Sequence, residues 1–222
     1  IIIGSSDSLN TGLTFLNTTK TSNFKNVIIS NLSNHNSDNY NLTGGLTFYQ
    51  SDVIFNQCTI SDNLSGDDLL NIFRSKFKII QSNFVNSLSD ALDADFCEGI
   101  IIDSNFLNSG NDAIDISGTN LEISNLYINK AQDKALSAGE NSIIKGSDIN
   151  ILNSEIGICS KDLSTINISN FVLKNNKIGI TAFQKKSKFG PGYLNLSKGI
   201  VKENEVDYLI EKNSIAYLNN NF

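Results

Sequence analysis

Apolar and polar positions alternate along the chain in a short pattern that returns at a fixed interval. Its central apolar position recurs every 22 residues, at Leu70, Leu92, Ile114, Leu136, Ile158 and Ile180, and a second lies two residues further on, at Ile72, Ala94, Ile116, Ala138, Ser160 and Ala182. The same strand is present upstream at Gly12–Phe15 and Gly45–Phe48, and again around Leu209. A fixed period in the range of about 20 to 50 residues predicts a solenoid.

Each repeat contains two further short strands. A second apolar run follows the first, at Val27–Ile29, Val53–Phe55, Ile79–Ile80, Ile100–Ile102, Ile143–Ile144 and Ile166–Ile168. A polar bend comes next, at Asn83-Phe84, Asn105-Phe106, Asn125-Leu126 and Asn170-Phe171. Asparagine tolerates the left-handed conformation that a sharp bend requires. Three alternating strands per coil, without a helical period, predict an all-β fold: a right-handed single-stranded parallel β-helix of about nine coils with 22-residue repeats.

The repeats predict a single domain over residues 1–222. Residues 1–39 are expected to form irregular N-terminal coils, residues 40–205 regular coils and residues 206–222 a C-terminal partial coil. The coil at 178–205 carries roughly seven extra residues, within the basic segment Phe183–Tyr193, and such insertions map to loops. The sequence has no Met and begins within an apolar run, which indicates a piece of a longer protein or a trimmed chain.

Charge and composition exclude several classes of partner and site. The net charge of −6 argues against nucleic acid. No apolar run approaches the ~18–20 residues of a membrane span. Cys58, Cys97 and Cys159 are odd in number and irregularly spaced, so no disulfide framework is expected, and Cys58 falls where Phe84 and Phe106 fall in later coils, which predicts a core position. The single histidine, His35, lies in an Asn/Ser turn, where it supports neither a His–Cys metal site nor a Ser–His–Asp triad.

Aligning the coils assigns three outward columns to the first strand. The first is small (Gly12, Gly45, Leu69, Ala91, Ala113, Ala135, Gly157, Gly179), the second polar (Thr47, Asn71, Asp93, Asp115, Ser137, Cys159, Thr181) and the third mixed (Tyr49, Phe73, Asp95, Ser117, Gly139, Lys161, Phe183). A small column beside a polar one predicts a shallow groove, and the aromatic residues at both ends of the third column, Phe183 included, suit stacking on sugar rings. The alternative is that Gly and Ala merely suit nearby tight turns.

Three aspartates gather on this strand. Asp93 and Asp115 share a column on neighbouring coils, about 4.8 Å apart, and Asp95 lies about 6.5–7 Å from Asp93 on the same face. Like charges at this spacing repel. A bound cation, a nearby Lys or Arg, or a raised pKa would relieve the repulsion, and hard oxygen ligands suit Ca²⁺. Asp93, Asp95 and Asp115 are therefore the candidate metal ligands; the alternative is a solvated acidic stripe.

Further charged residues surround the three aspartates. Asp68, Asp90 and Asp112 form a second acidic ladder at the turn before the strand, and Lys134 continues that ladder. Lys161 lies in the Asp95 column three coils on, about 14 Å away by coil spacing, and Arg74 lies one coil before Asp95.

The chain resembles the right-handed parallel β-helix superfamily of pectate lyases, polygalacturonases and mannuronan epimerases. Gly110–Asp115, G-N-D-A-I-D, is similar to the N-T-D-G-I-D strand of polygalacturonases without its threonine. The downstream histidine-glycine and R-I-K elements of those enzymes, and the D-P-H motif of the epimerases, are missing. Asp133–Ser142, Ser160–Ser164 and Phe183–Lys186 look more like uncharacterised bacterial β-helix repeat modules, some attached to spore-coat kinase-like domains. The resemblance implies the fold and a cell-envelope setting.

Two functions follow as expectations. The first is a secreted or cell-surface enzyme on acidic polysaccharide, a Ca²⁺-assisted lyase or epimerase by analogy with pectate lyases, or a glycosidase that pairs two of the acids. Its candidate catalytic residues are Asp93, Asp95, Asp115 and Lys161, and its candidate substrate-binding residues are Arg74, Asp112, Lys134, Phe183, Lys185 and Lys186. The second is a non-catalytic module that binds glycan or acts as a rigid spacer.

Overall fold

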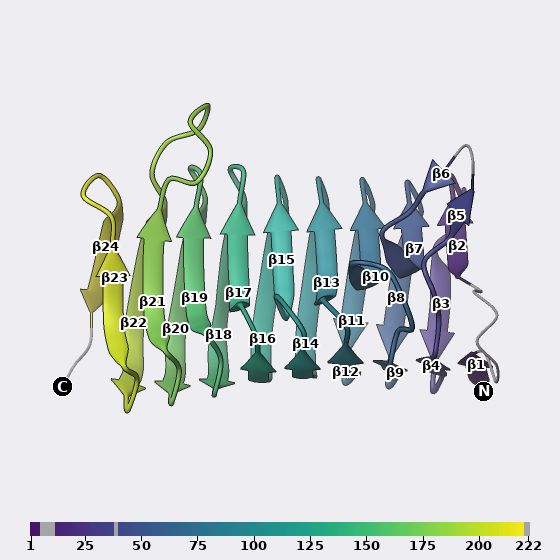
Figure 1. Cartoon of the computed structure of the whole chain (residues 1–222), viewed down its shortest axis with the longest axis horizontal. Coiled ribbons are helices and arrows are strands. Elements are labelled where there is room, and N and C mark those ends of the chain that lie inside the picture. The colour runs from purple at the N-terminus through teal and green to yellow at the C-terminus, as the bar shows by residue number, and fades with distance from the viewer. Residues whose placement is uncertain (5–11, 38–39, 220–222) are drawn as a thin grey trace.

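The chain winds as a parallel β-solenoid of about nine turns in the computed structural model, which describes residues 1–4, 12–37 and 40–219 (Figure 1). The described residues contain strands, turns and bends and no helix. The expected boundaries at 39 and 222 fall on residues outside the described part. Within the described residues, the predicted all-β solenoid with a spacing of ~22 residues is confirmed.

One strand from each turn builds a nine-stranded sheet that forms the front wall in Figure 1. In order these are β2 (Leu13–Leu16), β7 (Gly44–Tyr49), β10 (Asp68–Phe73), β13 (Asp90–Asp95), β15 (Ile114–Ser117), β17 (Lys134–Gly139), β19 (Ile156–Lys161), β21 (Ile178–Phe183) and β23 (Val206–Ile210). Leu70 pairs with Leu92, Leu92 with Ile114, and Ile114 with Leu136, so the repeat read from the sequence is the register of this sheet.

The remaining two sides of each turn belong to one 13-stranded sheet. Its path runs through β1 (Ile2–Gly4), β4 (Ile28–Ser30), β9 (Thr59–Ser61), β12 (Asn83–Ser87), β14 (Glu98–Ser109), β16 (Asn120–Ala131), β18 (Ile143–Leu152), β20 (Thr165–Lys174), β22 (Tyr193–Lys202) and β24 (Ile215–Asn219), joined by β3 (Ser22–Lys25), β8 (Val53–Asn56) and β11 (Lys76–Ile80). A two-stranded antiparallel pair, β5 (Asn36–Ser37) and β6 (Tyr40–Asn41), stands apart.

The prediction of three separate strands per coil holds only for the first turns. From β14 onward the second and third strands merge into one long strand, 12 residues in β14 and 12 in β16. The merged strands bend at a residue in the left-handed conformation, Asp103 (φ 53) in β14 and Asn125 (φ 50) in β16. A left-handed residue also lies between the separate strands β11 and β12, at Gln81 (φ 48), so β14 and β16 differ in that the ladder continues on both sides of the bend as one strand.

The bend lies elsewhere than predicted in two coils. Gln81 and Asp103, not Asn83 and Asn105, have positive φ. Asn83 and Asn105 lie two residues further on, where the Nδ2 of Asn105 donates to the Oδ1 of Asn83 over 2.8 Å. The bends at Asn125 and Asn170 are confirmed (φ 50 and 53).

The register also corrects the alignment of Cys58. Ile60, rather than Cys58, pairs with Phe84. The backbone N–H of Cys58 donates to the Oγ of Ser82, over 3.1 Å. Cys58 is nevertheless buried, as expected, and all three cysteines are free thiols.

Buried hydroxyls link the corners of successive turns. The Oγ of Ser82 accepts the backbone N–H of Cys58 over 3.1 Å and donates to the carbonyl of Ile80 over 2.8 Å. The backbone N–H of Ser82 donates in turn to the Oγ of Ser104, over 3.1 Å. Backbone groups that the sheet leaves unpaired at a corner are thus satisfied inside the solenoid, as buried polar groups must be.

Replacing Ser82 with alanine is expected to lower the free energy of unfolding by about 1–3 kcal/mol, because the buried N–H of Cys58 loses its acceptor. Urea unfolding followed by circular dichroism measures the change. Ser124→Ala is the control, since Ser124 is a partly exposed residue with no side-chain hydrogen bond among the described residues, and we expect a change within about 0.5 kcal/mol. Equal effects of the two changes would contradict the role given to the hydroxyl.

Candidate functional site

Asp93, Asp95 and Asp115 lie on one wall, as predicted. Asp93 pairs in register with Asn71 on one side and Asp115 on the other, and Asp115 pairs with Ser137. Asp95 pairs with Ser117 in the neighbouring outward column. The outward face of the nine-stranded sheet therefore carries the acids in the predicted order, and we call this face the acidic wall.

The small column does not border a groove, and that expectation is wrong. Ala91, Ala113 and Ala135 are at most 1% exposed and belong to the hydrophobic core. A Cβ added at Gly157 would come within 2.5 Å of the carbonyl oxygen of Gly179 on the next turn. These residues are small because they turn inward at the corner before the strand, where neighbouring turns approach closely.

Asp93 is the most perturbed acid of the wall. Its Oδ2 accepts a hydrogen bond from the Nδ2 of Asn71 over 3.1 Å. Burial, together with the negative charges of Asp68, Asp95, Asp115 and Asp90, raises the pKa of Asp93 to about 9. A carboxyl with this pKa carries a proton at neutral pH and can donate a hydrogen bond. The repulsion expected on this wall is therefore relieved at Asp93 by a raised pKa.

Asp115 is relieved differently, by a lysine. Lys161 ends β19, two turns away, yet its Nζ lies 3.5 Å from the Oδ1 of Asp115 and 2.9 Å from the Oγ of Ser137. The lysine side chain crosses Gly139, where an added Cβ would lie 2.8 Å from its Cε. A protonated acid and a lysine-paired acid thus stand side by side on neighbouring strands.

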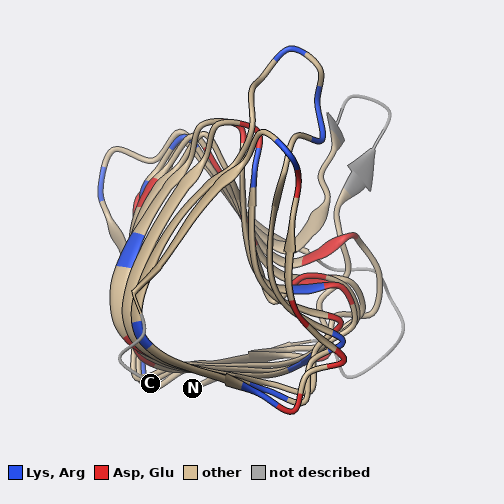
Figure 2. Ribbon diagram, turned by 90° about the vertical axis from the view of Figure 1, so that its left-hand side faces the viewer, with Lys and Arg blue, Asp and Glu red and all other residues tan. Residues whose placement is uncertain are grey.

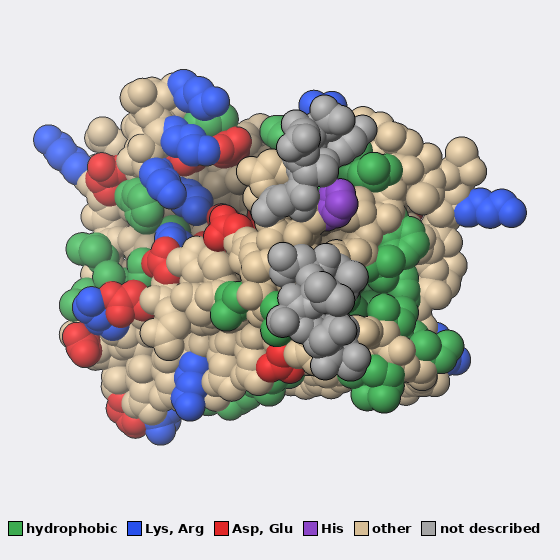
Figure 3. All heavy atoms as spheres, turned by 45° about the vertical axis from the view of Figure 1, so that its right-hand side comes forward, with side chains coloured by type: hydrophobic (Ala, Val, Ile, Leu, Met, Phe, Trp, Pro, Cys, Tyr) green, Lys and Arg blue, Asp and Glu red, His purple; other side chains and the backbone are tan. Residues whose placement is uncertain are grey.

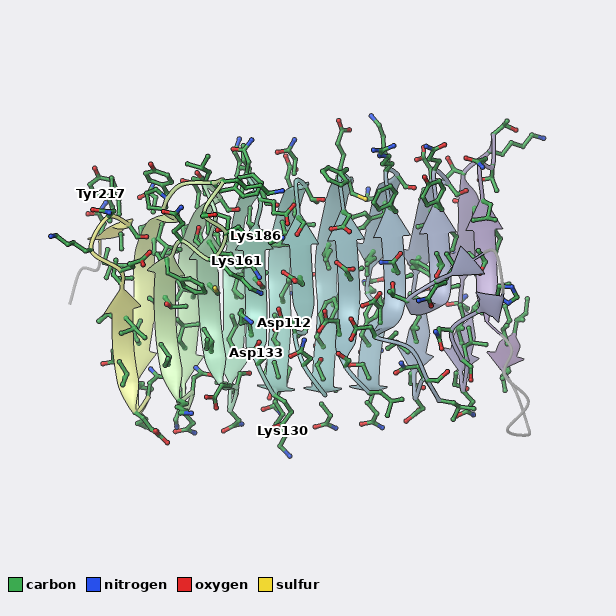
Figure 4. The ribbon with its side chains drawn as sticks, turned by 45° about the horizontal axis from the view of Figure 1, so that its top comes forward. Asp112, Lys130, Asp133, Lys161, Lys186 and Tyr217 are labelled. Carbon is green, nitrogen blue, oxygen red and sulfur yellow. The ribbon has the colours of Figure 1, made fainter. Side chains whose placement is uncertain are left out.

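The acids of the second ladder accept hydrogen bonds from backbone N–H groups of the next turn. The Oδ1 of Asp90 accepts the backbone N–H of Asp112 over 2.8 Å, and the Oδ1 of Asp112 accepts that of Lys134 over 2.8 Å. Burial is the main cause that raises the pKa of Asp90 and of Asp112 to about 7. The Lys134 ammonium group pairs with Asp112 over 3.4 Å and with Asp133 (Figure 4). The substrate-binding roles expected of Asp112 and Lys134 stay predictions.

Asp68 begins the same ladder. It is 2% exposed and its Oδ2 has no hydrogen-bond partner among the described residues. Burial is the main cause that raises the pKa of Asp68 to about 6, with the charges of Asp67 and Asp95 acting in the same direction and hydrogen bonds from Thr43 and Asn71 opposing it. Its charge in turn acts on Asp93 more than that of any other acid.

Aromatic side chains continue the third column away from the acids. Phe73 pairs in register with Asp95, and its ring stacks on Tyr49 with centroids 5.1 Å apart. The guanidinium group of Arg74 lies 5.2 Å from the centroid of Phe73 and 5.8 Å from that of Phe96. Arg74 is exposed beside a hollow of about 380 Å³, which leaves it accessible to a ligand.

The extra residues after β21 form a loop, residues 184–192, that stands above the neighbouring turns in Figures 1 and 2. We call this loop the arm. Phe183 precedes it and pairs in register with Lys161. Lys186 forms an ion pair with Glu140, and its charge lowers the pKa of Asp95, although burial and the charge of Asp115 raise that pKa overall. Figure 3 shows basic side chains gathered with acidic ones beside a hollow in the surface.

Sequence reasoning missed four residues of this site. Asn71 and Ser137 stand in the polar column but were given no role, while Glu140 and Asp162, which contact the arm, lie in turns. Asn71 and Ser137 could have been found from the sequence, because they occupy the same polar column as Asp93 and Asp115. For Glu140 and Asp162 no signal existed, because their contacts depend on the path of the arm.

A calcium site at Asp93, Asp95 and Asp115 stays a prediction. Within residues 1–4, 12–37 and 40–219, no three Asp, Glu, His or Cys side chains are arranged to bind a metal ion. Asp115 is committed to Lys161 and Asp93 to Asn71, so the side chains present do not fit the ion without rearrangement.

Another surface hollow lies away from the acids. It has a volume of about 480 Å³ and lies on β11, β14, β16 and β18, lined in part by Phe77, Ile100 and Lys145. The acids with strongly raised pKa values all lie on the nine-stranded sheet or at the turn before it, and none of them lines this hollow. No helix in the described part of the chain is long and apolar enough to span a membrane.

Comparisons with known proteins give distant likenesses of fold. No protein-family model and no curated protein sequence matches the chain. Among solved structures, a double mutant of the periplasmic alginate epimerase AlgG is similar, with 12% identity and a TM-score of 0.32, over 100% of this chain and 77% of the epimerase. Tailspike protein 3 of bacteriophage CBA120 is similar with 11% identity and a TM-score of 0.31, over 100% of this chain and 51% of the tailspike, about half its length.

Proposed function

We propose that the protein binds a polysaccharide chain along the acidic wall and hydrolyses it with Asp93 and Asp115. The observation that carries the proposal is the register that places these two residues side by side, with Asp115 paired to Lys161 over 3.5 Å and Asp93 hydrogen-bonded to Asn71. The raised pKa of Asp93 supports it, because two carboxyls with different proton occupancy can act as acid and as nucleophile or base.

The shape of the wall supports a linear substrate. The wall runs along the solenoid across successive turns, with hydroxyl and amide side chains in its polar column and the stacked rings of Tyr49 and Phe73 beyond the acids. Polar groups suit the hydroxyls of a sugar chain and aromatic faces suit its rings. The proposal includes a location outside the cytoplasm, secreted or at the cell surface, because a polysaccharide chain does not cross a membrane unaided.

The proposed reaction assigns one role to each acid. The protonated Asp93 donates its proton to the glycosidic oxygen as the bond to the anomeric carbon breaks. Asp115 attacks that carbon from the opposite side, and water then releases the sugar while Asp93 takes the proton of the water. Neighbouring strands lie about 4.8 Å apart, which favours the short carboxyl separation of retaining glycosidases over the wider one of inverting enzymes.

The test is incubation of the protein with polygalacturonate, alginate, xylan and a neutral glucan, with Ca²⁺ and with a chelator. We expect new reducing ends without unsaturated products and with retained anomeric configuration. Unsaturated products that require Ca²⁺ would overturn hydrolysis in favour of the lyase reaction.

A second candidate is a glycan-binding module without catalysis. The observation that favours it is that Lys161, Asp115 and Ser137 satisfy one another within the protein, as a structural network would. Saturable binding of one of these glycans, with no product from any of them, would support this candidate.

A further inference from the structure

The arm is built into the solenoid rather than attached as a flexible loop. The carboxylate of Asp162 lies at its base, with its Oδ1 accepting the backbone N–H of Lys185 over 2.8 Å and that of Lys186 over 2.7 Å. Asp162 itself is 0% exposed, while Lys185 and Lys186 are exposed residues. A fully buried acid therefore fixes the backbone of two exposed lysines.

Other bonds close the arm on itself. The side-chain amide of Gln184 donates to the carbonyl of Phe189 over 2.6 Å, and the backbone N–H of Phe189 donates to the carbonyl of Lys186 over 3.0 Å. The backbone N–H of Leu163 donates to the carbonyls of Gly190 and Pro191, each over 3.1 Å. Asp162 and its neighbour Leu163 thus contact the two ends of the arm.

This anchoring holds Lys186 close to the acidic side chains of earlier turns. Its ammonium group pairs with Glu140, two turns back along the solenoid, and its charge acts on Asp95, further along the same wall. Figure 4 shows Lys186 beside Lys161, which contacts Asp115. Two lysines from later turns therefore reach back to the acids from the same side.

We propose that Asp162 is the positioning residue of the arm: it directs Lys186 to the acidic wall, where the lysine exchanges Glu140 for an anionic group of a bound chain. The first half of this proposal concerns the chain alone. The second half rests on the proposed function and names the ligand as a polyanionic chain.

Amide hydrogen exchange on the unmodified protein tests the first half. We expect the N–H groups of Lys185 and Lys186 to exchange at least about 100-fold more slowly than those of Ser187 and Lys188, whose N–H groups have no partner among the described residues. Equal exchange at the four amides would overturn the anchoring. This measurement needs no substitution and is independent of any ligand.

Tryptic cleavage within the arm tests the role of Asp162 itself. Asp162→Ala is expected to raise cleavage after Lys185, Lys186 and Lys188 at least about tenfold, because local opening exposes the backbone to the protease. Asp162→Asn keeps an oxygen acceptor and is expected to restore most of the resistance. Asp103→Asn, which also removes one negative charge but lies at an exposed bend of the other sheet, is the control and should leave arm cleavage unchanged. Unchanged cleavage in Asp162→Ala would overturn the proposal.

Binding of polygalacturonate at low salt tests whether Lys186 contacts a polyanionic chain. The decisive observation is whether Asp162→Ala weakens or strengthens binding. Removing an acidic group from a protein of net charge −6 should by charge alone strengthen binding of a polyanion. We expect Asp162→Ala to weaken it about three- to tenfold, as Lys186→Gln does, and Glu140→Gln to strengthen it. Stronger binding in Asp162→Ala would overturn the role of Lys186. If the polymer does not bind the unmodified protein, the polyanionic ligand is wrong while the exchange result still decides the anchoring.

Discussion

Asp93→Asn is expected to lower the turnover of the cleaved polysaccharide by about 10²- to 10⁴-fold, the contribution of a general acid. Asparagine has nearly the same shape and still accepts the hydrogen bond from Asn71, so the loss concerns the proton that Asp93 donates. Release of reducing ends at substrate saturation measures the change.

Two further variants make this result interpretable. Asp115→Asn should cause a loss of similar or larger size, because it removes the partner carboxylate that Lys161 contacts. Asp103→Asn, at an exposed bend of the other sheet, should leave turnover unchanged. Full activity in Asp93→Asn would remove this residue from the reaction.

The free energy of unfolding is expected to decrease as the pH rises, by at least about 3 kcal/mol between about pH 5 and pH 8. The pKa values are raised to about 6 in Asp68, about 7 in Asp90 and Asp112 and about 9 in Asp93, against about 3.9 in an unfolded chain. Between about pH 4 and pH 9 the folded state therefore binds more protons than the unfolded state, and raising the pH favours unfolding. Thermal melts across this range measure the slope.

Asp93→Asn gives the control for this second prediction. The variant has no proton to lose at position 93, so its stability should depend less on pH and should exceed that of the unmodified protein at about pH 8. The same substitution is thus expected to lower turnover and raise the melting temperature. A melting temperature that rises with pH in the unmodified protein would contradict the raised pKa values.

The periodicity of the sequence was sufficient to predict the register and the acidic wall. Leu70, Leu92 and Ile114 stack as the 22-residue interval requires, and this stacking places Asp93 beside Asp115. A one-residue slip would turn every inward side chain outward, so the hydrophobic pattern determines the register.

The corners could not be predicted from residue type. Arg74 and Phe96 adopt positive φ (49 and 55) although neither residue favours it. The cost of a left-handed residue is about 1–2 kcal/mol, and the ladders on both sides of a corner outweigh it. Register between turns, rather than local preference, therefore decides where the chain bends.

The contacts of long side chains across turns could not be predicted from the sequence either. Coil spacing predicted that Lys161 lies three coils from Asp95 and gave it no contact with Asp115. In the structure the Lys161 side chain lies along the wall over Gly139, and its ammonium group therefore reaches Asp115. The contact of Asp162 with the arm could not be predicted either, because it depends on the path of the inserted loop. Strand register fixes Cα positions only, and a flexible side chain or an inserted loop can span more than one turn.

The corner hydroxyls have a consequence for how such a protein can change over time. At one corner the same hydrogen bond recurs over several turns: the hydroxyls of Thr119, Ser142 and Ser164 accept the backbone N–H groups of Cys97, Thr119 and Ser142, over 2.9, 3.1 and 3.1 Å. A duplication or deletion of one whole turn within this run therefore leaves its hydrogen bonds in place. It would move Lys186 relative to Asp95 only in increments of about 4.8 Å, so the spacing between charges that a descendant can offer is quantised by the pitch of the solenoid.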